Sequence, residues 1–165
     1  MLSAFLIQTL NGLASASSLF LVAAGLSLIF GVTRIVNFAH GSFYMLGVYV
    51  AYSVATHVGG ATGFWGGVLV SGVVVALVAL VAEVLILRRI YDAPELLQLI
   101  ATFALVLIIK DAALAIWGAE DLLGPRAPGF RGAVELFGRA VPSYDLLLIA
   151  LGVLVLLALT VLMRR

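Results

Sequence analysis

Long runs of apolar residues, separated by short polar stretches, constrain the fold of this chain more than any other feature. Five such runs cover most of its 165 residues; 64% of all residues are hydrophobic and only 10% are charged. A soluble domain usually carries about 25% charged residues. A run of about 20 apolar residues can cross a bilayer as an α-helix. The sequence therefore predicts an all-α fold, a polytopic transmembrane helix bundle in contact with the lipid bilayer.

The first apolar run extends from about Leu2 to Ile35, which is long for one span and short for two. Asn11-Gly12 inside it is a pair typical of turns. We therefore expect a short N-terminal interfacial helix over Leu2 to Leu10, followed by a first span from Leu13 to about Val32. The N-terminus has neither a basic stretch nor an A-x-A cleavage site, so it does not resemble a cleaved signal peptide.

Four further runs bring the expected number of spanning helices to about five. Asn37 is a plausible N-cap for the second span, because its side chain can accept from free N–H groups of the first turn. Pro94 suits the start of the fourth, since it has a fixed φ and no N–H. These spans are expected from Asn37 to about His57, Trp65 to about Leu87, Glu95 to about Trp117 and Ser143 to about Met163.

The remaining residues suggest one membrane domain over 1–165, with a single substantial extramembrane loop at 118–142. This loop contains prolines and both acidic and basic residues, and we expect at most one surface-lying helix in it. Basic residues in short flanks favour the cytoplasmic side. Arg88-Arg89 and Arg164-Arg165 end spans of like direction and should both lie inside. The N-terminus and the 118–142 loop are then expected outside.

The same residues argue against several classes of function. A net charge of +1 gives no reason to expect a nucleic-acid partner, and the absence of cysteine excludes disulfides and thiol-ligated metals. No G-x-x-x-x-G-K-[ST] phosphate loop is present, so this chain is not expected to hydrolyse ATP by that route. His40 and His57 stand at opposite ends of one predicted helix, roughly 25 Å apart, and cannot share a metal ion. We expect no catalytic residue, no metal and no cofactor.

Polar and small residues at membrane depth are the remaining candidates. Glu83 is either a gate or inter-helix contact, or a carboxylate that reaches the interface or pairs with a basic neighbour. Lys110 is expected to extend outward, and Asp111 to find a partner on another helix or at the outer interface. The spacing Gly63-x-x-x-Gly67-x-x-x-Ser71 favours close helix packing over a ligand-facing path.

One segment is more specific than composition. Asn11-Gly12-Leu13, a G-L-x-L-I-F-G stretch ending at Gly31, and N-F-A-H-G followed by F-Y-M-L-G resemble the branched-chain amino-acid ABC transporter permeases. The resemblance continues through Glu83, Arg88, Ala93-Pro94 and an L-I-A-T stretch ending at Thr102. It is densest over the first 50 residues. The motif residues are Asn37, Phe38, Ala39, His40 and Gly41.

The resemblance implies an ABC importer of branched-chain or related amino acids in the cell (inner) membrane, in which this chain forms part of the translocation path. Its implied partners are a second permease subunit in a homo- or heterodimer, cytoplasmic ATP-binding subunits that hydrolyse ATP, and a periplasmic amino-acid-binding protein. Family members are roughly twice this long, so the chain is expected to be the N-terminal part of a longer permease or a shortened form. The candidate path or gate residues are Asn37, His40, Ser42, Tyr44, Glu83 and Thr102.

Three alternatives remain open on the sequence. For Asn37 and His40 the alternative to a gate or coupling contact is a purely architectural role at the start of a helix. For the whole chain the alternatives are a truncated, non-transporting membrane scaffold and a secondary transporter or channel subunit. The last should show discontinuous helices and intramembrane charges more clearly than this chain does.

Overall fold

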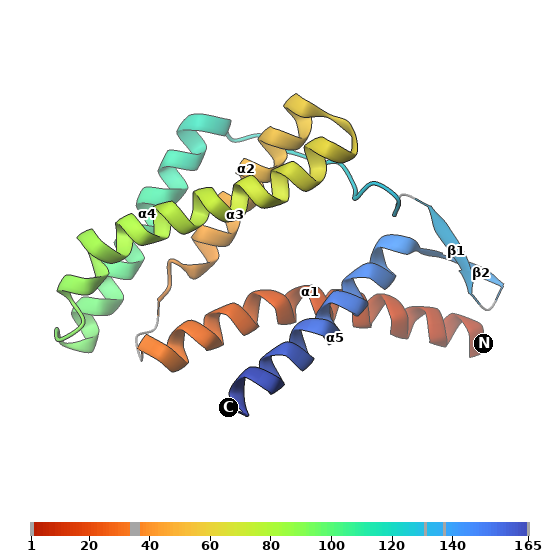
Figure 1. Cartoon of the computed structure of the whole chain (residues 1–165), viewed down its shortest axis with the longest axis horizontal. Helices are drawn as coiled ribbons and strands as arrows, with labels where there is room; N and C mark the ends of the chain where they lie inside the picture. Colours follow the sequence, from red (N-terminus) through yellow and green to blue (C-terminus); the bar gives the residue numbers. More distant parts are fainter. Residues whose placement is uncertain (1, 34–36, 131, 137, 165) are drawn as a thin grey trace. The chain divides into compact units, whose positions relative to one another are not determined.

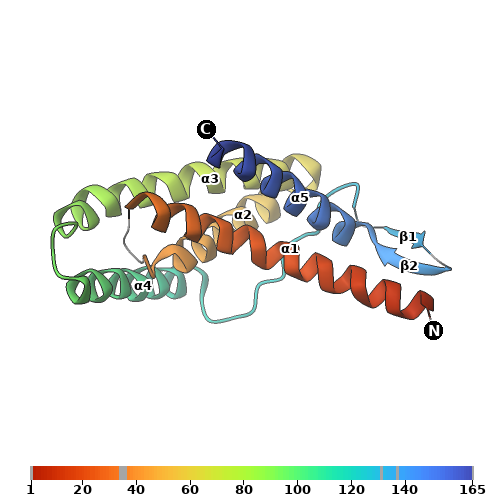
Figure 2. The ribbon, with the colours of Figure 1, turned by 90° about the horizontal axis from the view of Figure 1, so that it is seen from below.

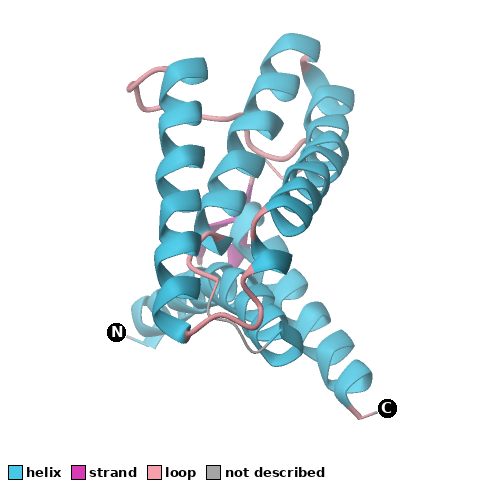
Figure 3. Cartoon of the chain, turned by 90° about the vertical axis from the view of Figure 1, so that its left-hand side faces the viewer, coloured by secondary structure: helices cyan, strands magenta, loops and turns pink. Residues whose placement is uncertain are grey.

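The structure, a computed structural model, describes residues 2–33, 37–130, 132–136 and 138–164. Most of these residues are helical, and a small two-stranded hairpin is the other regular structure (Figure 3). The predicted all-α class is therefore confirmed. The elements are α1 (Leu2–Thr33), α2 (His40–Val58), α3 (Gly60–Leu85), the 3-10 helix η1 (Leu87–Arg89), α4 (Glu95–Trp117), β1 (Ala133–Leu136), β2 (Arg139–Pro142) and α5 (Ser143–Met163) (Figure 1).

Four helices in the described part of the chain are long and apolar enough to cross a membrane. These spans cover Ala4–Gly31, Gly60–Arg89, Glu95–Trp117 and Ser143–Met163. The 19 residues of α2 are sufficient in length, but its Ser, Thr, Tyr and His residues leave it less apolar than the other four. The chain is thus a multi-pass membrane protein, and a fifth crossing by α2 stays a prediction. The limits expected for the fourth and fifth spans are confirmed by α4 and α5.

The expected break at Asn11-Gly12 is wrong. Helix α1 continues through it for 32 residues, so Leu2 to Leu10 is not a separate interfacial helix. Glycine permits a turn but does not require one, and within a helix it costs about 1 kcal/mol relative to alanine. In an apolar environment every backbone N–H needs an internal partner, which favours continuing the helix.

The chain divides into two compact units, Met1–Gly25 with Arg126–Arg165 and Leu26–Pro125. Within the Leu26–Pro125 unit, α2 and α3 form an antiparallel hairpin joined by Gly59 alone. Gly59 has φ +71° and Gly60 φ +61°. Only glycine adopts this left-handed region without strain, so the pair allows the abrupt reversal. Helix α3 thus begins at Gly60, earlier than the expected Trp65.

Small residues set how closely α2 and α3 approach. A Cβ added at Gly67 would lie 2.7 Å from the carbonyl oxygen of Ala51, and one at Gly63 would lie 3.1 Å from that of Ala55. Ser71 does not extend this pattern across the interface, because its hydroxyl donates to the carbonyl of Val68 in its own helix at 2.9 Å. The interpretation of Gly63 and Gly67 as helix-packing residues is confirmed.

The other unit contains the β-hairpin and α5. Strands β1 and β2 pair antiparallel with Val134 opposite Val141, and β2 leads directly into α5 (Figure 2). The backbone N–H and hydroxyl of Ser143 both donate to the carbonyl of Gly132, at 3.0 Å and 2.9 Å. The described residues of 118–142 form a loop as expected, but their regular structure is this hairpin and not a surface helix.

Candidate functional site

The N-F-A-H-G motif forms a tight turn that leads into α2. The Asn37 side-chain oxygen accepts from the N–H of Ala39 at 3.0 Å, and the Asn37 carbonyl accepts from the N–H of His40 at 3.2 Å. This is an Asx-type turn, in which the side chain bonds the backbone two residues on. Helix α2 therefore begins at His40, with Ala39 in the N-cap position. The expected N-cap role of Asn37 is wrong, although its side chain does bind a backbone N–H.

The turn formed by the N-F-A-H-G motif lies in the core of the Leu26–Pro125 unit. Ala39 has no exposed surface, and one helical turn later Phe43 is buried as well. Both belong to a cluster with Ala82 of α3 and with Leu105 and Ile109 of α4. The start of α2, the end of α3 and the middle of α4 therefore converge at this motif. A larger side chain at position 39 would have to displace one of these helices.

The candidate residues divide between the interior and the outside of this unit. Asn37, Ser42 and Thr102 are buried, and His40 is half-buried. Phe38 and Tyr44 are 54% and 55% exposed. The structure thus buries three of these polar residues and leaves the two aromatic residues exposed.

Thr102 is fully buried, yet its hydroxyl is used within its own helix. It donates to the carbonyls of Gln98 at 3.0 Å and Leu99 at 3.1 Å. Such bonds satisfy a buried hydroxyl without a partner on another helix. In this arrangement Thr102 supports the packing of α4, and it would have to break these bonds to contact a substrate.

Glu83 closes a hydrogen-bonded network around the α3–α4 turn. Its carboxylate accepts from the hydroxyl of Tyr91. The amide nitrogen of Gln98, one turn into α4, donates to the carbonyls of Tyr91 at 3.1 Å and Ala93 at 2.9 Å. Partial burial, followed by the hydrogen bond and negative charge of Glu83, raises the pKa of Tyr91 to about 12. The turn is thus hydrogen-bonded to both helices that it connects.

The sequence did not indicate Tyr91 and Gln98 as members of this network. A basic partner was one expectation for Glu83, but the hydrogen-bond partner is a tyrosine eight residues later. No periodic pattern links such positions, because the chain reverses between them. The sequence indicated a polar turn around Pro94, but it did not indicate that the side chain of Tyr91 folds back onto Glu83 of α3.

A second polar cluster joins the C-terminal end of α4 to the second half of α2. The ring of Trp117 stacks on Tyr49 with centroids 5.1 Å apart, and its indole nitrogen donates to the hydroxyl oxygen of Ser53 at 2.7 Å. The Ser53 hydroxyl in turn donates to the carbonyl of Tyr49 at 3.0 Å. This cluster ties α4 to α2 at the end opposite the motif.

Metal binding finds no support in the part of the chain that the structure describes. No group of three or more His, Asp or Glu side chains gathers there in a way that could hold an ion. His40 and His57 lie at the first and the penultimate residue of α2. The network around Glu83 holds a single carboxylate.

Comparison with known proteins gives consistent matches. The family described as branched-chain amino acid transport system / permease component matches residues 8–165. The high-affinity branched-chain amino acid transport system permease protein LivH is 25% identical in Salmonella typhimurium and 26% identical in Escherichia coli K12. Each alignment covers 97% of this chain and 55% of the relative. The chain therefore spans about half the length of these relatives.

A shorter match is closer in identity. The corresponding permease protein BraD of Pseudomonas aeruginosa is 40% identical over 52 residues, which are 32% of this chain and 17% of BraD. No solved structure matches the chain significantly.

Proposed function

Because the chain belongs to the branched-chain amino acid transport permease family, we propose that it forms part of the translocation path of an ABC importer for branched-chain or related amino acids. The family is one of transport permeases rather than enzymes. The observation that carries the proposal is the family match over residues 8–165. The N-F-A-H-G motif adds support, since it lies where three helices of one unit converge.

The importer would need partners that complete the path, hydrolyse ATP and deliver the amino acid. We propose a second permease subunit, cytoplasmic ATP-binding subunits that hydrolyse ATP, and a periplasmic amino-acid-binding protein, all at the inner membrane. The chain spans 55% of the LivH relatives, so further permease sequence, on this chain or on a partner, would complete the path. The residues at 118–142 would form an extramembrane loop facing the binding protein.

Gate residues are proposed at the motif and at the adjoining α3–α4 turn. His40 and Ser42 begin α2 beside the buried Ala39, and Glu83 follows Ala82 of the same cluster. A movement of α2 against α3 and α4 would therefore shift these polar side chains together. Asn37 and Thr102 would hold the backbone in place, and the exposed Tyr44 would contact a neighbouring part of the permease.

The chemistry of the substrate fits such a path. Branched-chain amino acids are zwitterions with apolar side chains, and they need a few polar partners in an otherwise apolar passage. The helices of this chain offer hydroxyl, imidazole and carboxylate groups at few positions along otherwise apolar surfaces.

Uptake of labelled leucine by proteoliposomes tests the proposal. Vesicles would contain this chain with a second permease subunit, the ATP-binding subunits and the binding protein, with ATP inside. We expect ATP-dependent accumulation that is lost when this chain is omitted. Accumulation that is unchanged without the chain would contradict the proposal and favour a non-transporting scaffold. Accumulation driven by an ion gradient without ATP would instead indicate a secondary transporter.

A further inference from the structure

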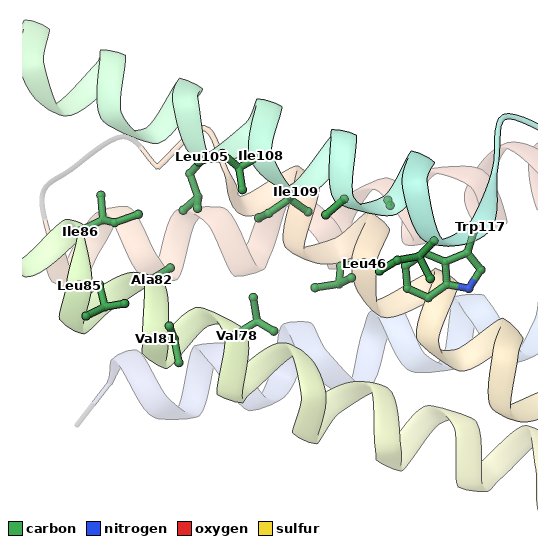
Figure 4. A pocket seen from close by; sticks show the side chains of 13 residues that line it. Leu46, Val78, Val81, Ala82, Leu85, Ile86, Leu105, Ile108, Ile109 and Trp117 are labelled. Atoms are coloured by element: carbon green, nitrogen blue, oxygen red, sulfur yellow. The ribbon is translucent and has the colours of Figure 1, made fainter.

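An apolar groove of about 320 Å³ runs between α3 and α4, and Leu46 of α2 contributes to its lining (Figure 4). Every lining side chain is a hydrocarbon except that of Trp117, whose one polar atom is already bonded to Ser53. Such a groove offers water no hydrogen-bond partner. The occupant must therefore be apolar.

The groove is open along one side. Its rim is formed by Leu85, Ile108 and Ile116, which are 53%, 59% and 68% exposed. Both walls belong to helices that are long and apolar enough to span a membrane. The open side therefore faces hydrocarbon rather than water wherever these helices cross the bilayer.

The size and lining of the groove favour a single hydrocarbon chain over another helix. A cavity of about 150 Å³ accommodates benzene, so 320 Å³ offers room for on the order of a dozen carbon atoms. Helices in membranes pack through small residues that let their backbones approach. The rim carries Leu and Ile instead, whereas the small residues Gly63 and Gly67 of α3 are already used against α2.

Two cations lie where the groove ends on α3. The last lining residue of that helix end is Ile86, and η1 follows it directly with the exposed Arg88 and Arg89. Guanidinium groups bind phosphate oxygens with paired hydrogen bonds. Glu83 is engaged by Tyr91, while Asp92 and Glu95 are exposed on the same turn. The turn therefore offers a local phosphate contact and no general attraction for anionic surfaces.

We propose that this groove is a phospholipid-binding site, with one acyl chain between α3 and α4 and the lipid phosphate at Arg88 and Arg89. The groove shares Ala82, Leu105 and Ile109 with the cluster at the motif, but it opens on another side of these helices' contact, and lipid occupancy can be measured without transport. It would select for a phosphate and an acyl chain, with little preference between zwitterionic and anionic headgroups.

Trp117 provides a direct readout, because it lines the groove. In a Trp65→Phe variant it is the remaining tryptophan. The purified chain in detergent would be titrated with a phosphatidylcholine whose acyl chains are brominated, since bromine quenches tryptophan fluorescence on contact. We expect saturable quenching at about one lipid per chain, and similar quenching by brominated phosphatidylglycerol.

A matched pair of substitutions tests the position of the acyl chain. Ala112 and Ala115 are both exposed on α4, but only Ala112 lines the groove. Ala112→Phe should weaken lipid binding about tenfold or more, because each methylene excluded from an apolar site costs roughly a fourfold loss of affinity. Ala115→Phe should leave it unchanged. The double variant Arg88→Gln/Arg89→Gln should weaken binding of the phospholipid but not of a brominated diacylglycerol, which has no phosphate.

Two results would overturn the proposal. Quenching that rises without saturation, and equally in Ala112→Phe, would mean that bulk lipid alone contacts Trp117. Quenching that decreases as protein concentration rises, together with dimers in a cross-linking experiment, would mean that a second copy of the chain fills the groove.

Discussion

At the scale of single residues, the motif combines a fixed backbone with polar side chains that have different surroundings. Asn37 binds the backbone of Ala39, and Ala39 is enclosed by three helices. His40 is half-buried directly after this fixed point. The resemblance drew attention to these five residues. It could not show that Ala39 shares a buried cluster with Ala82 and Leu105, since that cluster depends on how the helices fold back on each other.

The role of His40 can be separated from membrane insertion. We expect His40→Ala to lower leucine uptake by about tenfold in the reconstituted importer, the effect of losing one hydrogen-bonding group at a gate. The amount of inserted protein should stay the same. His57→Ala is the matched control, because His57 is exposed at the other end of α2. Equal uptake by both variants at equal expression would leave His40 a purely architectural role.

Asn37→Ala should destabilise the fold. It removes the acceptor for the buried N–H of Ala39, and an unsatisfied group of this kind costs about 1–3 kcal/mol. The measurement is thermal unfolding in detergent. Asn11→Ala is the control, since the other asparagine of the chain is exposed on α1 and its replacement should change stability little or raise it slightly. A loss of stability as large in Asn11→Ala would contradict this account.

At the scale of elements, apolar runs bounded by strong end signals were predictable. The residues Pro94 and Pro142 precede α4 and α5, and both helices have the expected limits. Runs with an internal polar pair were misjudged, as α1 shows at Asn11-Gly12. The β-hairpin was missed because its strands are four residues each, too short for an alternating pattern to stand out.

The α2–α3 hairpin offers a sharp test of helix packing. Gly67→Ala places a Cβ 2.7 Å from the backbone oxygen of Ala51, so the helices must separate, at a cost of about 1–3 kcal/mol. Gly66→Ala is the matched control, because a Cβ there meets nothing within 4 Å. We expect a lower unfolding temperature for Gly67→Ala alone. Equal unfolding temperatures for the two variants would show that this close approach is unimportant.

At the scale of the whole molecule, the positive residues predict orientation. Arg88 and Arg89 are exposed on the turn between two spanning helices, and basic flanks favour the cytoplasm. The family match agrees with a multi-pass protein but does not test which side each loop faces. Sidedness depends on how the chain enters the membrane, and neither composition nor the packing within a unit determines it.

Cysteine labelling can decide the orientation, because these 165 residues contain no cysteine. Asp92→Cys and Leu123→Cys introduce single thiols at exposed positions on the two sides of α4. In intact spheroplasts, a membrane-impermeant maleimide should label Leu123→Cys at once and Asp92→Cys after lysis. The reverse order would invert the proposed topology and place the α3–α4 turn outside.

The single-residue link at Gly59 also has a consequence for how the protein is made. Helix α2 is the least apolar of the long helices, whereas α3 is strongly apolar. With no loop to separate them, a crossing by α2 would have to form together with that of α3, as a helix pair. The hydroxyls of Ser53 and Thr56 and the imidazole of His57 already bond to carbonyls within α2, which lowers the cost of that step. We therefore expect α2 to cross the bilayer only after α3 has been synthesised.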